Sequence, residues 1–191
     1  MAQRGWFIDL GRCIGCQSCT VACKAEQNTA PVVAPLVFKG RNIQRPLHVS
    51  YRWVVAREGG TYPNVTRSFV SSACNHCEDP ACIKACPVKG ISKRADGIVL
   101  IDQDKCIGCK YCMWACPYGA PQWNEMTQKV EKCTMCVERV DKGLEPACAT
   151  TCVGKALTYV ENFNSSQSGA NAPDGFANPV VTKPSIRFAK A

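Results

Sequence analysis

Twelve residues in the second half of the chain carry four closely spaced cysteines. The stretch Cys106–Pro117 reads C-I-G-C-K-Y-C-M-W-A-C-P, with three cysteines at every third position, a fourth four residues later, and then a proline. In iron–sulfur proteins with this spacing the first three thiolates converge on one 4Fe–4S cluster, and the fourth ligates a second cluster. The stretch therefore requires another set of cysteines elsewhere in the chain.

The 16 cysteines of this 191-residue chain fall into four runs, named I to IV in chain order. Run I repeats the spacing of the stretch above, run II has a wider gap after its second cysteine, and run IV has eleven residues in that gap. Runs II and III end in a proline, whereas Val153 follows run IV. Run I is Cys13, Cys16, Cys19 and Cys23; run II is Cys74, Cys77, Cys82 and Cys86; run III is Cys106, Cys109, Cys112 and Cys116; run IV is Cys133, Cys136, Cys148 and Cys152.

Disulfides and zinc are the alternative uses of so many cysteines. Cysteines separated by two residues, repeated along the chain, suit closure on one metal centre better than cross-links between distant segments. Zinc sites combine C-x-x-C pairs with each other or with histidines, but the chain has only His48 and His76. A zinc site also does not explain why a third cysteine follows three residues after the second, or why a proline follows the fourth cysteine. A zinc-binding structural protein is nevertheless kept as the alternative of a different class, and it would be colourless.

An internal repeat surrounds the first and third runs. I-D-L-G-R-C-I-G-C at 8–16 parallels I-D-Q-D-K-C-I-G-C at 101–109. Asp9 and Asp102 each lie four residues before a cysteine, where a carboxylate is expected to accept hydrogen bonds from backbone N–H groups of the turn. The repeat indicates that the two runs fold in the same way.

The segments between the runs predict short strands. Residues Gly5–Asp9 and 156–160 read as strands that could pair, and 49–57 with 64–72 as a hairpin. Residues 91–101 predict a second hairpin with Asp96-Gly97 at its turn. The first half of 24–73 is rich in Pro, Ala and Val and is expected to be loop. Residues 161–191 are expected to be an extended tail that wraps over a partner, is disordered or is held on the surface.

Several side chains near the runs are expected to pack or to tune a cluster. We interpret His76 as a surface residue or a neighbour of the ligands, with tuning of a cluster's reduction potential as the alternative. Trp114 and Trp123 are expected to pack against the loops that carry the clusters. Basic residues beside the runs favour the electron-rich state of a cluster and so raise its reduction potential; they are Arg12, Lys24, Lys84, Lys105, Lys110 and Lys132.

The formal net charge is +8 when every thiol is counted as neutral. Sixteen thiolates and four oxidised cores of about +2 each would contribute about −8, so the loaded protein would be close to neutral. A nucleic-acid partner is not needed to explain the basic residues. The sequence has no apolar run of 18 residues, which predicts no membrane span, and its N-terminus lacks a signal peptide's apolar stretch.

The predicted function is electron transfer without catalysis. Four clusters with four cysteine ligands each leave no open iron position, and the chain has no Ser/His/Asp set, Walker loop or G-x-G-x-x-G motif. The predicted fold class is α+β, with two ferredoxin-like modules of two 4Fe–4S clusters each, extended loops and a C-terminal tail. We expect an outer module at 1–60 plus 125–160, an inner module inserted at 61–124, and the tail at 161–191.

Three motifs make the chain resemble a known family. They are C-N-H-C-E-D-P-A-C, D-K-C-I-G-C-K-Y-C-M-W-A-C-P-Y-G-A-P-Q, and K-C-T-M-C followed by P-A-C. With these motifs the chain resembles the iron–sulfur subunit of the anaerobic dimethyl sulfoxide reductases, and it is similar to the electron-transfer subunits of polysulfide reductase and formate dehydrogenase. The resemblance covers about residues 4–160.

The resemblance implies a ligand set for each of four 4Fe–4S clusters. Some relatives replace a cysteine of run III with tryptophan and hold a 3Fe–4S cluster, but this chain keeps Cys109. The implied sets, named sites 1 to 4, are Cys13, Cys16, Cys19 and Cys152 for site 1; Cys23, Cys133, Cys136 and Cys148 for site 2; Cys74, Cys77, Cys82 and Cys116 for site 3; and Cys86, Cys106, Cys109 and Cys112 for site 4.

The resemblance also implies two partners. One is a catalytic subunit with a molybdenum or tungsten bis-pterin cofactor, near sites 1 and 2, and the other is a quinone-reactive membrane anchor near sites 3 and 4. The complex would lie at the cytoplasmic membrane, with the periplasmic side favoured through a partner that carries the export signal, and with the cytoplasmic side left open. A free polyferredoxin that serves several soluble enzymes is the alternative function.

Overall fold

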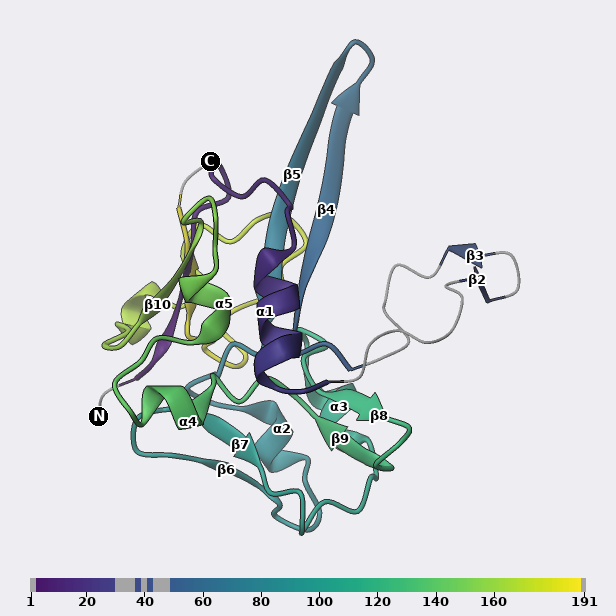
Figure 1. The fold of residues 1–191 in the computed structure, drawn as a ribbon, viewed down its shortest axis with the longest axis vertical. Coiled ribbons are helices and arrows are strands. Elements are labelled where there is room, and N and C mark those ends of the chain that lie inside the picture. Colours follow the sequence, from purple (N-terminus) through teal and green to yellow (C-terminus); the bar gives the residue numbers. More distant parts are fainter. Residues whose placement is uncertain (1–2, 30–36, 39–40, 43–48, 190–191) are drawn as a thin grey trace.

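A long hairpin projects from a body of short helices and strands (Figure 1). The structure is a computed structural model that describes residues 3–29, 37–38, 41–42 and 49–189. The loop expected in the first half of 24–73 falls largely outside these residues, although a two-residue pairing of β2 (Val37–Phe38) with β3 (Arg41–Asn42) is described. Helix and strand content is mixed, as an α+β protein requires.

The two ends of the chain meet in a three-stranded sheet. Strand β1 (Gly5–Ile8) lies at its centre and pairs antiparallel with β10 (Leu157–Val160), which confirms the pairing predicted for these segments. Strand β11 (Ile186–Phe188) pairs with the other edge of β1 in parallel. Trp6 and Ile8 on β1 are each only 1% exposed, so this sheet covers the main core.

The predicted hairpin of the cysteine-free stretch is longer than expected. Strands β4 (Arg52–Thr61) and β5 (Asn64–Ala73) pair over their whole length. Figure 1 shows the distal half standing clear of the body, and Tyr62 at its tip is 92% exposed. At the base, Val70 and Ala73 are buried. Only the base of the hairpin therefore belongs to the core.

The middle of the chain forms small elements that separate the cysteine runs. Strands β6 (Ile91–Lys93) and β7 (Val99–Ile101) make the second predicted hairpin, with Gly97 of its loop at φ +86°. Strands β8 (Gln122–Asn124) and β9 (Lys129–Glu131) form a third hairpin. The remaining elements are α1 (Ser18–Glu26), α2 (Ala81–Lys84), α3 (Tyr111–Ala115), α4 (Val137–Val140), α5 (Ala147–Thr150) and the 3₁₀ turn η1 (Ser165–Gln167).

The C-terminal tail is neither disordered nor only surface-held, which corrects that expectation for residues up to 189. Its strand β11 places Ile186 and Phe188 in the core at 3% and 2% exposure. The tail also pairs with the loop of run II, because Ser185 N donates to Asn75 O over 3.0 Å and Glu78 N donates to Lys183 O over 2.8 Å. Composition missed this because the strand is only three residues long and follows a polar segment.

Truncating Phe188 is expected to destabilise the protein strongly. The ring packs edge-on against Phe176 with centroids 5.4 Å apart, and Phe→Ala in a core costs about 3–5 kcal/mol. Phe188→Ala should therefore lower the thermal midpoint in an anaerobic melt followed by circular dichroism. Val181→Ala is the matched control, since Val181 lies in the same tail at 65% exposure. Equal midpoints for the two variants would mean that β11 is not part of the stable core.

Candidate metal centres

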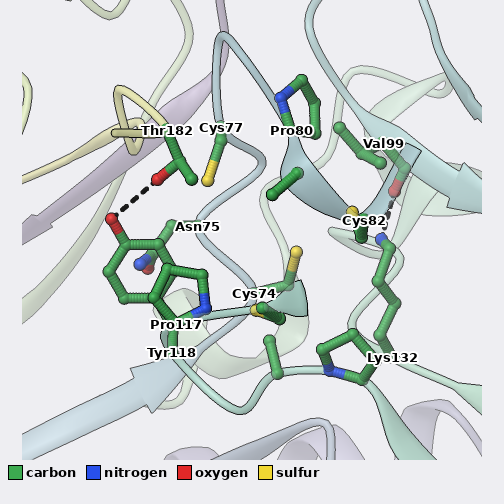
Figure 2. Close-up of a pocket in the computed structure, with 14 residues that line it drawn as sticks. Cys74, Asn75, Cys77, Pro80, Cys82, Val99, Pro117, Tyr118, Lys132 and Thr182 are labelled. Carbon is green, nitrogen blue, oxygen red and sulfur yellow. Dashed lines mark hydrogen bonds between the residues drawn. The ribbon is translucent and has the colours of Figure 1, made fainter. Parts of the chain in front are cut away.

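Sites 3, 1 and 4 each coincide with a cavity in the structure. The cavity at site 3 has an empty volume of about 370 Å³, and sulfur atoms line it (Figure 2). The cavity at site 1 measures about 400 Å³ and the cavity at site 4 about 330 Å³. The lining of each cavity contains all four cysteines of its site: Cys74, Cys77, Cys82 and Cys116; Cys13, Cys16, Cys19 and Cys152; and Cys86, Cys106, Cys109 and Cys112.

The cysteines of site 2 are brought together in a more deeply buried place. Exposure is 5% for Cys23, 6% for Cys133, 5% for Cys136 and 3% for Cys148. Burial raises the pKa of the Cys23 thiol to about 12, and nearby Cys148 and Cys136 add to the rise. Burial likewise raises the pKa of Cys133, and the nearby thiol of Cys23 adds to the rise. These thiols therefore surround one another, although they line none of the three cavities above.

Burial and neighbouring thiols also raise the pKa of individual cysteines at sites 3 and 4. Burial raises the pKa of Cys112 to about 11, and Cys109 and Cys106 of the same site add to it. Burial also raises the pKa of Cys77 to about 12, with Cys74 next in importance. Thiols must lose their protons to bind iron, so crowded thiols of this kind stay protonated until a cation is bound.

The repeat seen in the sequence has a structural counterpart in runs I and III. Gly15 and Gly108 adopt φ +71° and +70°, and the residues before α1 and α3, Gln17 and Lys110, adopt φ +61° and +65°. These left-handed positions turn the backbone so that each helix delivers its cysteines inward. Asp9 Oδ1 accepts from Arg12 N over 3.1 Å, and Asp102 Oδ1 accepts from Asp104 N over 3.0 Å, which confirms their role as turn acceptors.

A side chain at Gly108 should disrupt site 4. A Cβ there would lie 2.6 Å from Gln128 O and 2.9 Å from Trp123 Cζ3, and a positive φ is unfavourable for other residues. We expect Gly108→Ala to reduce the bound iron by about a quarter and to change one component of the electron paramagnetic resonance (EPR) spectrum. Gly143→Ala is the control, because φ is also positive there but nothing lies within 4 Å. Similar iron loss in both variants would contradict the steric argument.

Runs II and IV deliver their third cysteine through a shared P-A-C sequence. Pro80 precedes α2 and Pro146 precedes α5, and the cysteine is the second residue of each helix. Proline suits this place because it has no N–H to leave unpaired. Backbone N–H groups also reach sulfur: Gly90 N donates to Cys86 Sγ over 3.2 Å, and Met135 N to Cys133 Sγ over 3.3 Å.

The six basic residues singled out beside the runs divide into two classes. Arg12 and Lys110 line the cavities of sites 1 and 4, and Lys132 lines that of site 3 at 4% exposure. Lys132 Nζ donates to Val99 O and, over 3.0 Å, to Cys133 O. The others line none of the three cavities: Lys84 pairs with Asp79, and Lys105 pairs with Asp102. Lys24 donates to Val49 O, and its charge also interacts with the Cys23 thiol of site 2.

For His76 the surface alternative was wrong, and Trp114 is more exposed than expected. His76 is not on the surface but fully buried, and its Nδ1 accepts from Val99 N over 3.0 Å while Nε2 has no partner. Burial lowers its pKa well below the usual value, and Lys132 adds to the effect, so the imidazole is neutral. Trp114 is 79% exposed, and its ring centroid lies 5.9 Å from that of Tyr111 in the same run. Trp123 covers Gly108 as expected.

Sequence reasoning missed two residues at these sites. Thr182, in the C-terminal tail, lines the cavity of site 3, and its hydroxyl is 2.9 Å from Tyr118 Oη (Figure 2). Arg52, at the base of the hairpin, is 1% exposed and lies close enough to Cys148, Cys133 and Cys19 for their thiols to affect its pKa. Neither residue is near a cysteine in the sequence, so no local signal could have indicated it.

The donor sets suit an iron–sulfur cluster better than a single ion. Each of the three cavities is lined by four thiols that come from two different runs, which is the ligation pattern of two-cluster iron–sulfur modules. All 16 cysteines are free thiols in the structure.

Comparison with known proteins identifies the family. Residues 65–162 match the 4Fe-4S dicluster domain. The sequence is 38% identical to the B subunit of anaerobic dimethyl sulfoxide reductase from Escherichia coli (strain K12), over 96% of this chain and 87% of that protein. It is 44% identical to the B subunit of tetrathionate reductase from Salmonella typhimurium, over 78% and 54% of the two proteins, and 38% identical to the B subunit of selenate reductase from Mesobacillus selenatarsenatis, over 84% and 61%.

The described part of the protein contains no helix with the length and apolar character needed to cross a bilayer. The cysteine arrangement and the matches lead to one assignment. The protein belongs to the family of iron–sulfur B subunits of anaerobic dimethyl sulfoxide reductase and related molybdoenzymes, and it is a non-catalytic electron-transfer subunit of such a complex.

Proposed function

We propose that this protein holds four 4Fe–4S clusters at sites 1 to 4 and relays single electrons through a respiratory complex. The observation that carries this proposal is the composition of the three cavities. Each cavity is lined by four cysteines, of which three come from one run and the fourth from another. This exchange of the fourth cysteine is the ligation pattern of two-cluster modules.

The positions of the sites support a linear relay. Cys19 of site 1 and Cys23 of site 2 lie one turn apart on α1. Burial is the main cause of the raised pKa of Cys133 in site 2, and the nearby thiol of Cys74 in site 3 adds to the rise. The pKa of Cys82 in site 3 is also raised mainly by burial, and the nearby thiol of Cys112 in site 4 adds to the rise. These interactions between thiols of successive sites support a relay that runs through sites 1, 2, 3 and 4 in that order.

The residues of this protein would hold and insulate the redox centres. Each cluster, when bound, would supply one site for reversible one-electron transfer. The cysteine thiolates would hold the clusters, and the buried walls of the sites would exclude water. The backbone N–H groups of Gly90 and Met135, which donate to the sulfur atoms of Cys86 and Cys133, would stabilise negative charge at sulfur. The Lys132 ammonium would do the same at site 3. Both effects raise the reduction potential of a cluster.

The nested arrangement of two modules is part of the proposal. The pairing of β1 with β10 supports an outer module made from both ends of the chain. The boundary expected at residue 60 falls inside the β4–β5 hairpin, which is continuously paired. Because Val54 and Ser71 line the cavity of site 1, we place the whole hairpin in the outer module and begin the inner one after Ala73.

The two ends of the relay would face different partners. Sites 1 and 2 would lie nearer a molybdenum or tungsten bis-pterin catalytic subunit, and sites 3 and 4 nearer a quinone-reactive membrane anchor. Apolar side chains are exposed at both ends: Ile14 at 64% and Val153 at 69% beside site 1, and Ile107 at 65% beside site 4. The complex would be peripheral to the cytoplasmic membrane, on the periplasmic side if a partner carries the export signal.

Anaerobic purification with partners retained tests the function. We expect about 16 iron and 16 sulfide per chain, together with a large co-purifying subunit that contains molybdenum or tungsten and a membrane protein. A monomer with the same iron content would instead support a free polyferredoxin. Little iron with several equivalents of zinc would overturn the relay and make the runs structural.

A further inference from the structure

A buried arginine lies between sites 1 and 2 without a carboxylate partner. Arg52 begins β4 and is 1% exposed. Its guanidinium stacks over Trp6, with Cζ 4.4 Å from the ring centroid. One nitrogen, Nη1, donates to Ser71 Oγ over 3.0 Å, whereas Nε and Nη2 are buried without a nitrogen or oxygen acceptor among the described residues. Burial raises the pKa of the Cys148 thiol, and the charge and a hydrogen bond of the Arg52 side chain oppose that rise. None of the ion pairs in the described part of the protein includes Arg52.

A guanidinium in this position needs a counter-ion. An unpaired buried charge is strongly destabilising, and an arginine cannot escape the penalty by losing its proton at ordinary pH. The aromatic face of Trp6 and one serine hydroxyl satisfy only part of the group. Two of its donor nitrogens therefore require an anionic acceptor, and no carboxylate among the described residues supplies one.

The surroundings of Arg52 indicate what that acceptor is. The thiols that interact with its charge are those of Cys148, Cys133, Cys19 and Cys23. Cys19 belongs to site 1 and the other three to site 2. Ser71 links the guanidinium to site 1, because the Ser71 hydroxyl that accepts from Arg52 is 3.4 Å from Cys19 Sγ. Arg52 thus lies where the two sites meet.

We propose that Arg52 is the shared counter-ion of sites 1 and 2, and that its Nε and Nη2 donate to sulfur atoms of the clusters or of their cysteine ligands. The inference rests on the function proposed above. Arg52 acts as a positioning residue that sets the potentials of two neighbouring centres together. Its positive charge favours the electron-rich state, so it raises both potentials.

The geometry of the arginine guanidinium matters as well as its charge. A guanidinium presents several N–H donors in fixed directions and is able to serve two acceptors at once, whereas a lysine is a single point charge. Arg52→Lys should retain part of the effect, and Arg52→Gln should remove the charge. Arg67→Gln is the matched control, because Arg67 lies on the paired strand β5 with its side chain 58% exposed and forms its ion pair with Glu58.

The test is an EPR-monitored redox titration of the purified complex, with iron counted in each variant. We expect Arg52→Gln to shift the reduction equilibrium of two of the four clusters about tenfold toward the oxidised form, or about 59 mV for a one-electron couple. Arg52→Lys should give a smaller shift, and Arg67→Gln none. If Arg52→Gln loses about eight iron while Arg52→Lys retains them, the charge is required for assembly, which also supports the inference.

Two results would overturn the inference while the proposed function stands. One is a full iron complement with all four potentials unchanged in Arg52→Gln, which would make Arg52 a packing partner of Trp6. The other is equal iron loss in Arg52→Gln and Arg52→Lys, which would mean that shape rather than charge is needed. Absence of iron in the unmodified complex would instead overturn the function and the inference together.

Discussion

Removing the iron from this protein is expected to abolish its folded state. The elements of the structure are too small to be stable alone, because four of the five described sheets have two strands and the longest described helix, α1, has nine residues. Two-stranded hairpins and helices of that length are marginal in water. Ligation energy in such a protein is folding energy, and the clusters fill space that side chains do not occupy.

The buried polar groups strengthen this expectation. Without clusters, the charged groups of Arg52 and Lys132 would stay buried with no anionic partner among the described residues, which is strongly destabilising. Anaerobic chelation of the purified protein should therefore remove the cooperative melting transition in circular dichroism and expose the whole chain to protease. Rebuilding with iron and sulfide should restore both, as a control for damage. An iron-free protein that melts cooperatively near the original temperature would contradict the expectation.

Replacing two neighbouring cysteines of run III should damage two different clusters. Cys112 lines the cavity of site 4, whereas Cys116, four residues later and just beyond α3, lines that of site 3. Each thiol is one of four around its site. Cys112→Ala and Cys116→Ala are therefore each expected to cost up to four of about 16 iron atoms, or to leave a three-iron form, and each should alter a different EPR component.

A second cysteine variant at each site provides the control for the assignment of Cys112 to site 4 and Cys116 to site 3. Cys74→Ala should alter the same EPR component as Cys116→Ala, because both residues line the cavity of site 3. Cys109→Ala should likewise match Cys112→Ala at site 4. If Cys112→Ala and Cys116→Ala altered the same component, run III would bind a single cluster and the exchange of its fourth cysteine would be wrong.

The elements around the cysteines could be predicted because their causes are local. Regular spacing of Cys106, Cys109 and Cys112 follows from the geometry of thiolates that converge on one centre, and it needs no knowledge of the rest of the fold. The turn carboxylates Asp9 and Asp102 act within four residues of themselves. Alternating apolar residues and turn signals were sufficient for β4, β5, β6 and β7.

Other features depend on which distant segments pack together, and local patterns do not encode that. Strand β11 is recognisable only because β1 leaves one edge free for it. His76 is buried rather than exposed because β7 covers it, with Val99 N donating to its ring. Trp114 is exposed because α3 turns its cysteines, not this ring, toward the sites.

The chemistry of this protein could be read from its residues alone: 16 cysteines in four runs, a spacing typical of iron–sulfur ligation, and no catalytic set of its own. Ligand spacing is a short-range property, so it is visible in a single sequence. Arg12, Lys110 and Lys132 could be predicted in the same way, because each is next to a cysteine in the sequence. The position of Arg52 is instead a product of long-range packing. Arg52 is 19 residues from Ser71 along the chain and far from Cys133, and it reaches sites 1 and 2 because the base of the β4–β5 hairpin packs between them.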